Sequence, residues 1–183
     1  MPNISFKTPW RQTGLRWLWI MVIFFIFDQW TKQYAVSHLF LGERFEVMPF
    51  FNFILVYNKG AAFSLFANQP GWQVYFFATI STVVSLGLLY WLYTLPAKNK
   101  WLSIALCLIL AGAMGNLYDR VTLEKVVDFI DWYYGGYHFP AFNIADSVIL
   151  LGALMMLFDN FFNPQENETN KKQVSNKKEK SNE

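Results

Sequence analysis

Long apolar stretches without a charged side chain constrain this chain more than any other feature. Segments 72–95 and 101–117 contain no Asp, Glu, Lys or Arg. A helix needs about 20 apolar residues to cross the hydrocarbon core of a bilayer. The whole chain is 54% hydrophobic and only 15% charged, which is too apolar for an ordinary soluble domain. We therefore expect a mainly α-helical membrane protein.

Two further apolar runs contain charges and are still interpreted as membrane spans. Segment 144–162 is apolar except for two aspartates near its ends. In the first run, Asp28 and Lys32 stand four positions apart, so a helix places them on one face as an ion pair. A cleaved secretory signal is the alternative for this first run. The four predicted transmembrane helices cover about 16–37, 72–95, 101–117 and 144–162.

The basic residues predict how these spans are oriented. They precede the first span, lie between the second and third, and follow the fourth: Lys7, Arg11, Arg16, Lys98, Lys100, Lys171, Lys172, Lys177, Lys178 and Lys180. By the positive-inside rule those segments, and hence both termini, are cytoplasmic. Segments 38–71 and 118–143 then face outward. We expect one membrane domain, 1–163, and a disordered cytoplasmic tail, 164–183, because the tail is polar and lacks aromatic residues.

The first outward segment is predicted to form a small extracytoplasmic β-rich unit between helices 1 and 2. Residues 44–57 are rich in Phe, Val, Ile and Tyr and partly alternate in polarity, which indicates short strands. Asn58-Lys59-Gly60 then indicates a turn. The strands either offer an edge to an extended peptide or form a self-contained hairpin.

The remaining composition excludes several other classes. A net charge of +2, with basic residues that follow topology, gives no sign of nucleic-acid binding. The single cysteine, Cys107, allows no disulfide within the chain. We expect a monomer whose partners are membrane lipid and a substrate, with no metal or organic cofactor.

Two aspartates in the outward part of the chain are the candidate catalytic residues. Carboxylates at a membrane boundary are unfavourable and indicate a function. Asp128 lies between Val127 and Phe129 with no charged partner beside it, so burial would raise its pKa. If Asp146 lies close by, the pair titrates as a unit and holds one proton, more often on Asp128. Such a pair can activate water, and which carboxylate acts as the base stays open.

Other polar residues gather on the same predicted side of the membrane and are candidates to line or support the site: Asp28, Lys32, Asn58, Asn116, Arg120 and Asn143. Simpler roles compete with this interpretation. Asn143 and Asp146 have the spacing of a helix capping box. Asp119 and Arg120 can form a local ion pair that ends the third helix. Gly112 fits close helix packing.

Five sequence blocks in order resemble one known family. They are DQWTK at 28–32, NKGAAFS at 58–64, GAMGNLYDR at 112–120, VVDFI at 126–130 and FPAFNIAD at 139–146. Together they resemble lipoprotein signal peptidase (signal peptidase II), the bacterial membrane aspartic proteases, over most of residues 17–162. The family usually has a glycine between its Asp-Arg pair and its Val-Val-Asp block, whereas this chain has none in 121–125.

The resemblance implies that Asp128 and Asp146 are the catalytic pair and that the polar residues named above, with Gly112, support the site. It implies cleavage of diacylglyceryl-modified prolipoproteins before the lipidated cysteine, at the outer face of the bacterial cytoplasmic (inner) membrane. A proton- or cation-coupled transporter subunit is the alternative. A metal hydrolase using His138 with Asp128, Asp131 and Asp146 is a third possibility, although aspartates without histidine partners bind zinc poorly.

Overall fold

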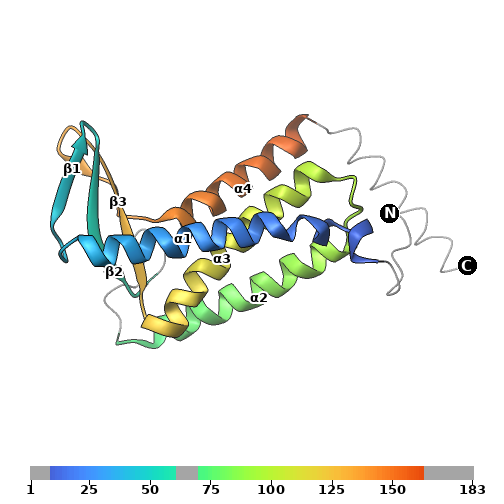
Figure 1. The fold of residues 1–183 in the computed structure, drawn as a ribbon, viewed down its shortest axis with the longest axis horizontal. Helices are drawn as coiled ribbons and strands as arrows, with labels where there is room; N and C mark the ends of the chain where they lie inside the picture. Colours follow the sequence, from blue (N-terminus) through green and yellow to red (C-terminus); the bar gives the residue numbers. More distant parts are fainter. Residues whose placement is uncertain (1–8, 61–69, 163–183) are drawn as a thin grey trace, which may run out of the picture.

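The computed structural model describes residues 9–60 and 70–162, so the predicted tail at 164–183 lies outside the described residues. Two short 3-10 helices precede the first α-helix (Figure 1). The α-helices are α1 (Leu18–His38), α2 (Trp72–Thr94), α3 (Lys100–Leu123) and α4 (Ile144–Phe162). The strands are β1 (Arg44–Met48), β2 (Phe51–Asn58), β3 (Val126–Tyr134) and β4 (Tyr137–His138).

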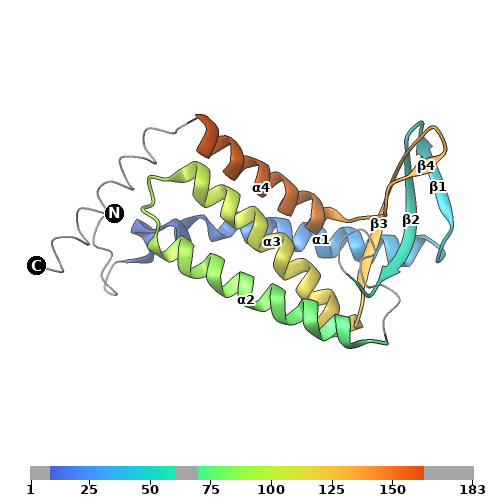
Figure 2. The same cartoon turned by 180° about the vertical axis from the view of Figure 1, so that it is seen from behind.

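Helix α3 is the centre of the bundle. It packs against α1, α2 and α4, and Figures 1 and 2 show α2 and α4 on opposite sides of it. Its side chains Leu106 and Leu110 are completely buried, together with Leu92 of α2. Small residues let α4 approach closely: a Cβ added to Gly152 would lie 2.6 Å from the carbonyl oxygen of Ala105. Close packing of this kind is the main source of helix association in lipid.

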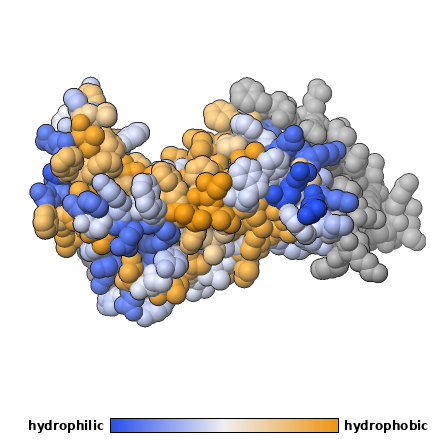
Figure 3. All heavy atoms as spheres, in the orientation of Figure 1, coloured by the Kyte–Doolittle hydropathy of each residue, from blue (hydrophilic) through white to orange (hydrophobic). Residues whose placement is uncertain are grey.

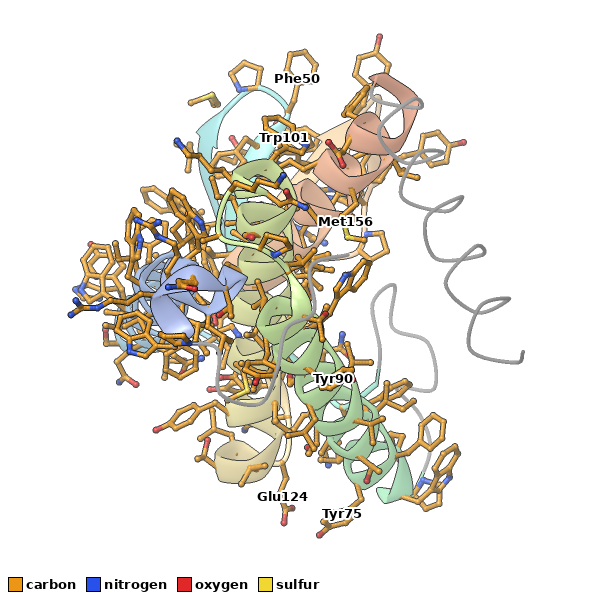
Figure 4. The ribbon with its side chains drawn as sticks, turned by 90° about the vertical axis from the view of Figure 1, so that its right-hand side faces the viewer. Phe50, Tyr75, Tyr90, Trp101, Glu124 and Met156 are labelled. Carbon is orange, nitrogen blue, oxygen red and sulfur yellow. The ribbon has the colours of Figure 1, made fainter. Side chains whose placement is uncertain are left out.

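Helices α2 and α3 are long and apolar enough to cross a membrane, judged by length and composition. Figure 3 shows an apolar band over the middle of the bundle, with hydrophilic residues gathered toward each end. Along α2 many large apolar side chains are exposed, among them Tyr75 and Tyr90. Tyr75 points away from the bundle in Figure 4. Such an exposed apolar surface is expected where lipid is the solvent.

Helix α3 continues six residues beyond the predicted end at residue 117. Asp119 and Arg120, which were predicted to end this helix, instead lie within it and are buried, with Lys32 and the Asn116 carbonyl as partners. The helix ends at Leu123, and the next residue, Glu124, has a left-handed conformation with a φ of 56°. That conformation costs a residue other than glycine about 1–2 kcal/mol. Glu124 therefore occupies a position that favours glycine, and its side chain points away from the bundle (Figure 4).

The sheet is larger than the sequence predicted. Strands occur in the first outward segment, as expected, but β3 and β4 come from the second, for which the sequence predicts no strand. The order is β1-β2-β3-β4 and every pair is antiparallel. Gly135 and Gly136 join β3 to β4 with φ values of 56° and 85°, as a tight two-residue hairpin requires. The run of β-branched and aromatic residues at 126–134, directly before this Gly-Gly pair, was the overlooked signal.

The sheet lies across one end of the bundle, and the turn between α2 and α3 lies at the other (Figures 1 and 2). The N-terminal described segment is attached to that turn. The Gly14 amide donates to the carbonyl of Leu95 at 2.8 Å, and the Ala97 amide donates to the Gln12 carbonyl at 2.9 Å.

At the opposite end of the bundle, where the sheet lies, three segments that are distant in sequence meet: β2, β3 and the start of α4.

Candidate active site

The two candidate catalytic aspartates meet through Asn143. Asp128 is buried on β3, while Asp146 lies in the first turn of α4 and is partly exposed. The Asn143 side chain donates from Nδ2 to Asp128 Oδ1 at 2.7 Å. Its backbone amide donates to Asp146 Oδ2 at 3.2 Å. One residue thus holds both carboxylates.

The capping box suggested by the spacing of Asn143 and Asp146 is present. The Asp146 amide donates to Asn143 Oδ1 at 3.0 Å, reciprocating the bond from the Asn143 amide to the Asp146 carboxylate. Capping fixes the first helical turn. It is compatible with catalysis because the cap uses one carboxylate oxygen of Asp146 and leaves the other to a different partner.

Two more asparagines complete the hydrogen bonds of the carboxylates. Asn58, at the end of β2, donates from Nδ2 to Asp128 Oδ2 at 3.2 Å. Asn116, on α3, donates from Nδ2 to Asp146 Oδ1 at 2.8 Å. Each carboxylate therefore accepts two N–H bonds, which restrains its rotation and leaves lone pairs for water.

Burial is the largest influence on Asp128. It raises the pKa of this carboxyl group from 3.8 to about 7, and the negative charge of Asp146 acts in the same direction. The hydrogen bonds from Asn58 and Asn143 and the charge of Lys32 oppose the rise. A carboxyl group with a pKa near neutrality can hold a proton at physiological pH and act as an acid.

A buried cluster of charged side chains from α1 and α3 lies next to the two candidate catalytic aspartates. Lys32 Nζ is 2.9 Å from Asp28 Oδ2, forming the ion pair predicted from their spacing, and 2.9 Å from Asp119 Oδ2. All three side chains are at most 3% exposed. Asp28 also accepts from the Ala145 amide at 2.8 Å, so it anchors the start of α4 to α1. A Cβ on Gly115 would lie 2.5 Å from the Asp28 carboxylate, so glycine leaves room for the cluster.

The local ion pair between Asp119 and Arg120 is not formed. Asp119 instead pairs with Lys32 and accepts from the Val127 amide at 3.2 Å, which ties β3 to α3. The sequence also gave no reason to single out Gln29. Its Nε2 donates to Asp119 Oδ1 at 3.0 Å and to Asp28 Oδ2 at 3.1 Å. Its place in the DQWTK block, between Asp28 and Lys32, is the sequence signal that could have identified it.

Arg120 and Gly112 hold neighbouring parts of the chain in place around the two aspartates. Arg120 is buried, and its Nη2 donates to the Gly60 carbonyl at 2.8 Å, joining α3 to the turn after β2. Its guanidinium lies over the ring of Phe77, 5.6 Å from the centroid. Gly112 faces α4, where an added Cβ would meet the carbonyl oxygen of Ala145. Its packing role therefore sets the position of the helix that carries Asp146.

The four residues proposed for a metal site form two separate pairs, His138 with Asp131 and Asp128 with Asp146. His138 Nδ1 is 2.9 Å from Asp131 Oδ2, and the same oxygen accepts from Asn52 at 2.9 Å. Burial opposes ionisation of Asp131, but hydrogen bonds from Asn52 and His138 outweigh it and lower its pKa. Asp128 and Asp131 are three apart on β3 and therefore face opposite sides of the strand. Over residues 9–60 and 70–162, no cluster of three His, Cys, Asp or Glu suits a metal ion.

Comparison with known proteins gives the family. Residues 20–162 match the family model of signal peptidase (SPase) II. The chain is 49% identical over 153 residues to the lipoprotein signal peptidase of Alteromonas mediterranea, covering 84% of each chain. It is 47% identical over 165 residues to that of Acinetobacter baumannii, covering 88% of this chain and 94% of the relative.

A solved structure agrees with this assignment. A bacterial membrane enzyme aligns with a TM-score of 0.72 and 35% sequence identity, over 80% of this chain and 88% of that one. Together with the paired aspartates at the end of an apolar bundle, these similarities define a membrane protease. The chain belongs to the signal peptidase II family.

Proposed function

We propose that this protein removes the signal peptides of bacterial prolipoproteins through a water-activating pair formed by Asp128 and Asp146. The family match and the names of the relatives support the lipoprotein substrate. The observation that carries the mechanism is Asn143, which hydrogen-bonds both carboxylates at once. An asparagine in that position holds the two acids in one fixed arrangement.

In the proposed mechanism Asp128 starts protonated and Asp146 starts ionised. The N-terminus of α4 and two N–H donors favour the charged form of Asp146. Asp146 takes a proton from water, the water oxygen bonds to the scissile carbonyl carbon, and Asp128 donates its proton to the carbonyl oxygen. The resulting gem-diol collapses, the C–N bond breaks, and a carboxyl group returns a proton to the leaving amine.

The supporting residues have distinct roles in this proposal. Asn58, Asn116 and Asn143 orient the carboxylates, and Arg120 anchors the turn at Gly60. Asp28 and Lys32 secure the start of α4. The substrate's cysteine carries diacylglycerol, which keeps the scissile bond at the outer leaflet. Cleavage then occurs directly before that cysteine.

The proposed topology has four transmembrane helices, with both termini in the cytoplasm and the sheet outside. The described basic residues near the N-terminus, such as Arg11 and Arg16, lie at the same end of the bundle as Lys98 and Lys100. This agrees with the positive-inside rule. The proposed active unit is a monomer comprising residues 1–163.

Single substitutions test the catalytic pair. Asp128→Asn and Asp146→Asn retain the shape of each side chain but cannot exchange the proton, so each should reduce cleavage by at least about 10³-fold. The measurement is conversion of a purified, lipidated prolipoprotein in detergent, with the Asp131→Asn variant as a matched control on the same strand. Near-normal cleavage by either catalytic variant would contradict the mechanism.

A further inference from the structure

The ammonium group of Lys32 contacts a neutral side chain in addition to its two ion-pair partners. It has three N–H bonds and three acceptors: Asp28 Oδ2 and Asp119 Oδ2 at 2.9 Å, and Asn116 Oδ1 at 3.0 Å. The first two are counter-charges. The third is the neutral side chain that holds Asp146.

That contact fixes the orientation of the Asn116 amide. An amide side chain can place either its oxygen or its NH₂ group toward a neighbour. Because an ammonium group can only donate, Lys32 requires the oxygen of Asn116 on its side. The NH₂ group is then directed at Asp146 Oδ1, 2.8 Å away.

The same oxygen also leads to the second catalytic carboxylate. Asn143 Nδ2 lies 3.3 Å from Asn116 Oδ1 and 2.7 Å from Asp128 Oδ1. Asn116 is therefore a junction between Lys32 and both aspartates. Hydrogen bonds in a buried chain polarise one another, so a charge at one end affects the other.

We propose that Lys32 is a positioning residue for the catalytic pair, which orients and polarises Asn116 and thereby sets the pH range in which the pair carries a single proton. This inference rests on the proposed function, since it needs Asp128 and Asp146 to react. Lys32 contacts no reacting atom itself. It acts from the buried side of the site, through Asn116.

The charges around the pair fit this role. Among the described residues, the other charged groups near the aspartates are Asp28 on α1 and Asp119 and Arg120 on α3. The positive charge of Lys32 lowers the pKa of Asp128 against the dominant effect of burial. Removing that charge should therefore move proton loss from the pair to higher pH.

The test is the pH profile of cleavage by the full-length protein in detergent. For Lys32→Met we expect kcat at pH 7 to fall at least tenfold and the profile to shift upward by about one pH unit, the usual effect of a nearby opposite charge. KM should change less than about twofold, because Lys32 is buried behind Asn116. Lys32→Arg, which keeps the charge, should retain a profile closer to the original.

A charge-balanced double variant distinguishes the effect of Lys32 on catalysis from its effect on the stability of the fold. Lys32→Met leaves Asp28 and Asp119 without the ammonium group that bonds both of them, which destabilises the folded protein. Asp28→Asn combined with Lys32→Met removes one charge of each sign. The side-chain oxygen introduced by Asp28→Asn would still accept from the Ala145 backbone amide. We expect this double variant to fold, with a lowered kcat because Asn116 is no longer oriented. The pH profile should shift less than in Lys32→Met, because the two lost charges act on the pair in opposite directions.

Gln29→Leu is the structural control. Gln29 contacts Asp28 and Asp119 as Lys32 does, but its side-chain hydrogen bonds go to Asp28, Asp119 and the Gly115 carbonyl and not to Asn116. Its loss should reduce the thermal stability without moving the pH profile. A wild-type kcat in the folded double variant, or a shift in Gln29→Leu equal to that of Lys32→Met, would overturn the role of Lys32. The proposed function would stand in that case, because it depends on inactive Asp128→Asn and Asp146→Asn variants.

Discussion

At the scale of single residues, the site depends on placing acids where water is scarce. Asp128 is 3% exposed and has asparagine donors at both oxygens. Neutral amide donors restrain the carboxylate without the compensation that a directly bonded cation would give. Burial and the charge of Asp146 therefore raise the pKa of Asp128 to about 7. On the same strand, hydrogen bonds from Asn52 and His138 and the charge of Arg44 overcome burial and lower the pKa of Asp131.

The raised pKa of Asp128 predicts a pH dependence of stability. Between its unfolded value of 3.8 and its folded value of about 7, the folded protein holds a proton that the unfolded chain releases. The free energy of unfolding should therefore decrease by about 1.4 kcal/mol per pH unit across this window. Thermal unfolding in detergent from pH 4.5 to 8.5 measures this slope.

The Asp128→Asn variant isolates that contribution. It has no proton to lose at this position, so its unfolding temperature should vary less with pH than that of the wild type. Above about pH 8 the two curves should run parallel, because Asp128 is ionised in both folded and unfolded wild-type protein. Equal slopes below pH 7 would show that Asp128 does not titrate there.

At the scale of elements, the active site requires α3 and α4 to approach closely. Gly112 and Gly115 leave space on α3 for the backbone of α4 and for the Asp28 carboxylate. The start of α4 is then held by its own capping box and by the bond from the Ala145 amide to Asp28. A rigid helix start is what lets Asp146 keep its position beside β3.

Gly112→Ala tests this close approach. The added methyl group would meet the Ala145 carbonyl and lie 2.6 Å from Ile149 Cγ1, so α4 must shift. We expect a loss of about 1–3 kcal/mol of stability, typical of overpacking, together with reduced cleavage. Unfolding temperature and cleavage rate of the purified variant are the measurements.

Gly87→Ala is the matched control on α2. A Cβ at Gly87 has no atom within 4 Å, and alanine is favoured over glycine in a helix by about 0.5–1 kcal/mol. This variant should be as stable as the wild type or slightly more so, with unchanged cleavage. Equal behaviour of the two alanine variants would mean that the α3–α4 contact is not tightly packed.

At the scale of the whole molecule, the sheet and the α2–α3 turn lie at opposite ends of the apolar bundle (Figure 1). The buried charged side chains gather at the sheet end: Asp28, Lys32, Asp119, Arg120, Asp128 and Asp131. Such an arrangement suits hydrolysis at one membrane surface better than transport, which needs polar groups along a path across the bilayer.

Labelling of single cysteines tests the proposed orientation. In a Cys107→Ala background, Tyr137→Cys places a thiol on β4, where the native side chain is 84% exposed, and Lys98→Cys places one in the α2–α3 turn. A membrane-impermeant maleimide should label the first in intact spheroplasts and the second only after lysis. The reverse pattern would show that the protein is inserted the other way round.

Local chemistry accounts for what the sequence alone predicted. Hydropathy located α2 and α4 to within a residue, the i, i+4 spacing predicted the Asp28–Lys32 ion pair, and the i, i+3 spacing predicted the cap of α4. Each depends on residues within one helix. The roles of the two catalytic aspartates followed from their setting and the family resemblance, and they remain predictions.

Tertiary structure alone decided the long-range partners. The pairing of β3 with β2, the contact of Asp119 with Lys32, and the bond from Lys32 to Asn116 each join residues more than 60 positions apart. A buried polar group takes whichever partner the fold brings within hydrogen-bond distance, because leaving it unpaired is costly. The sequence therefore identified the polar residues of the site, and the packing of α1, α3, α4 and β3 determined which of them meet.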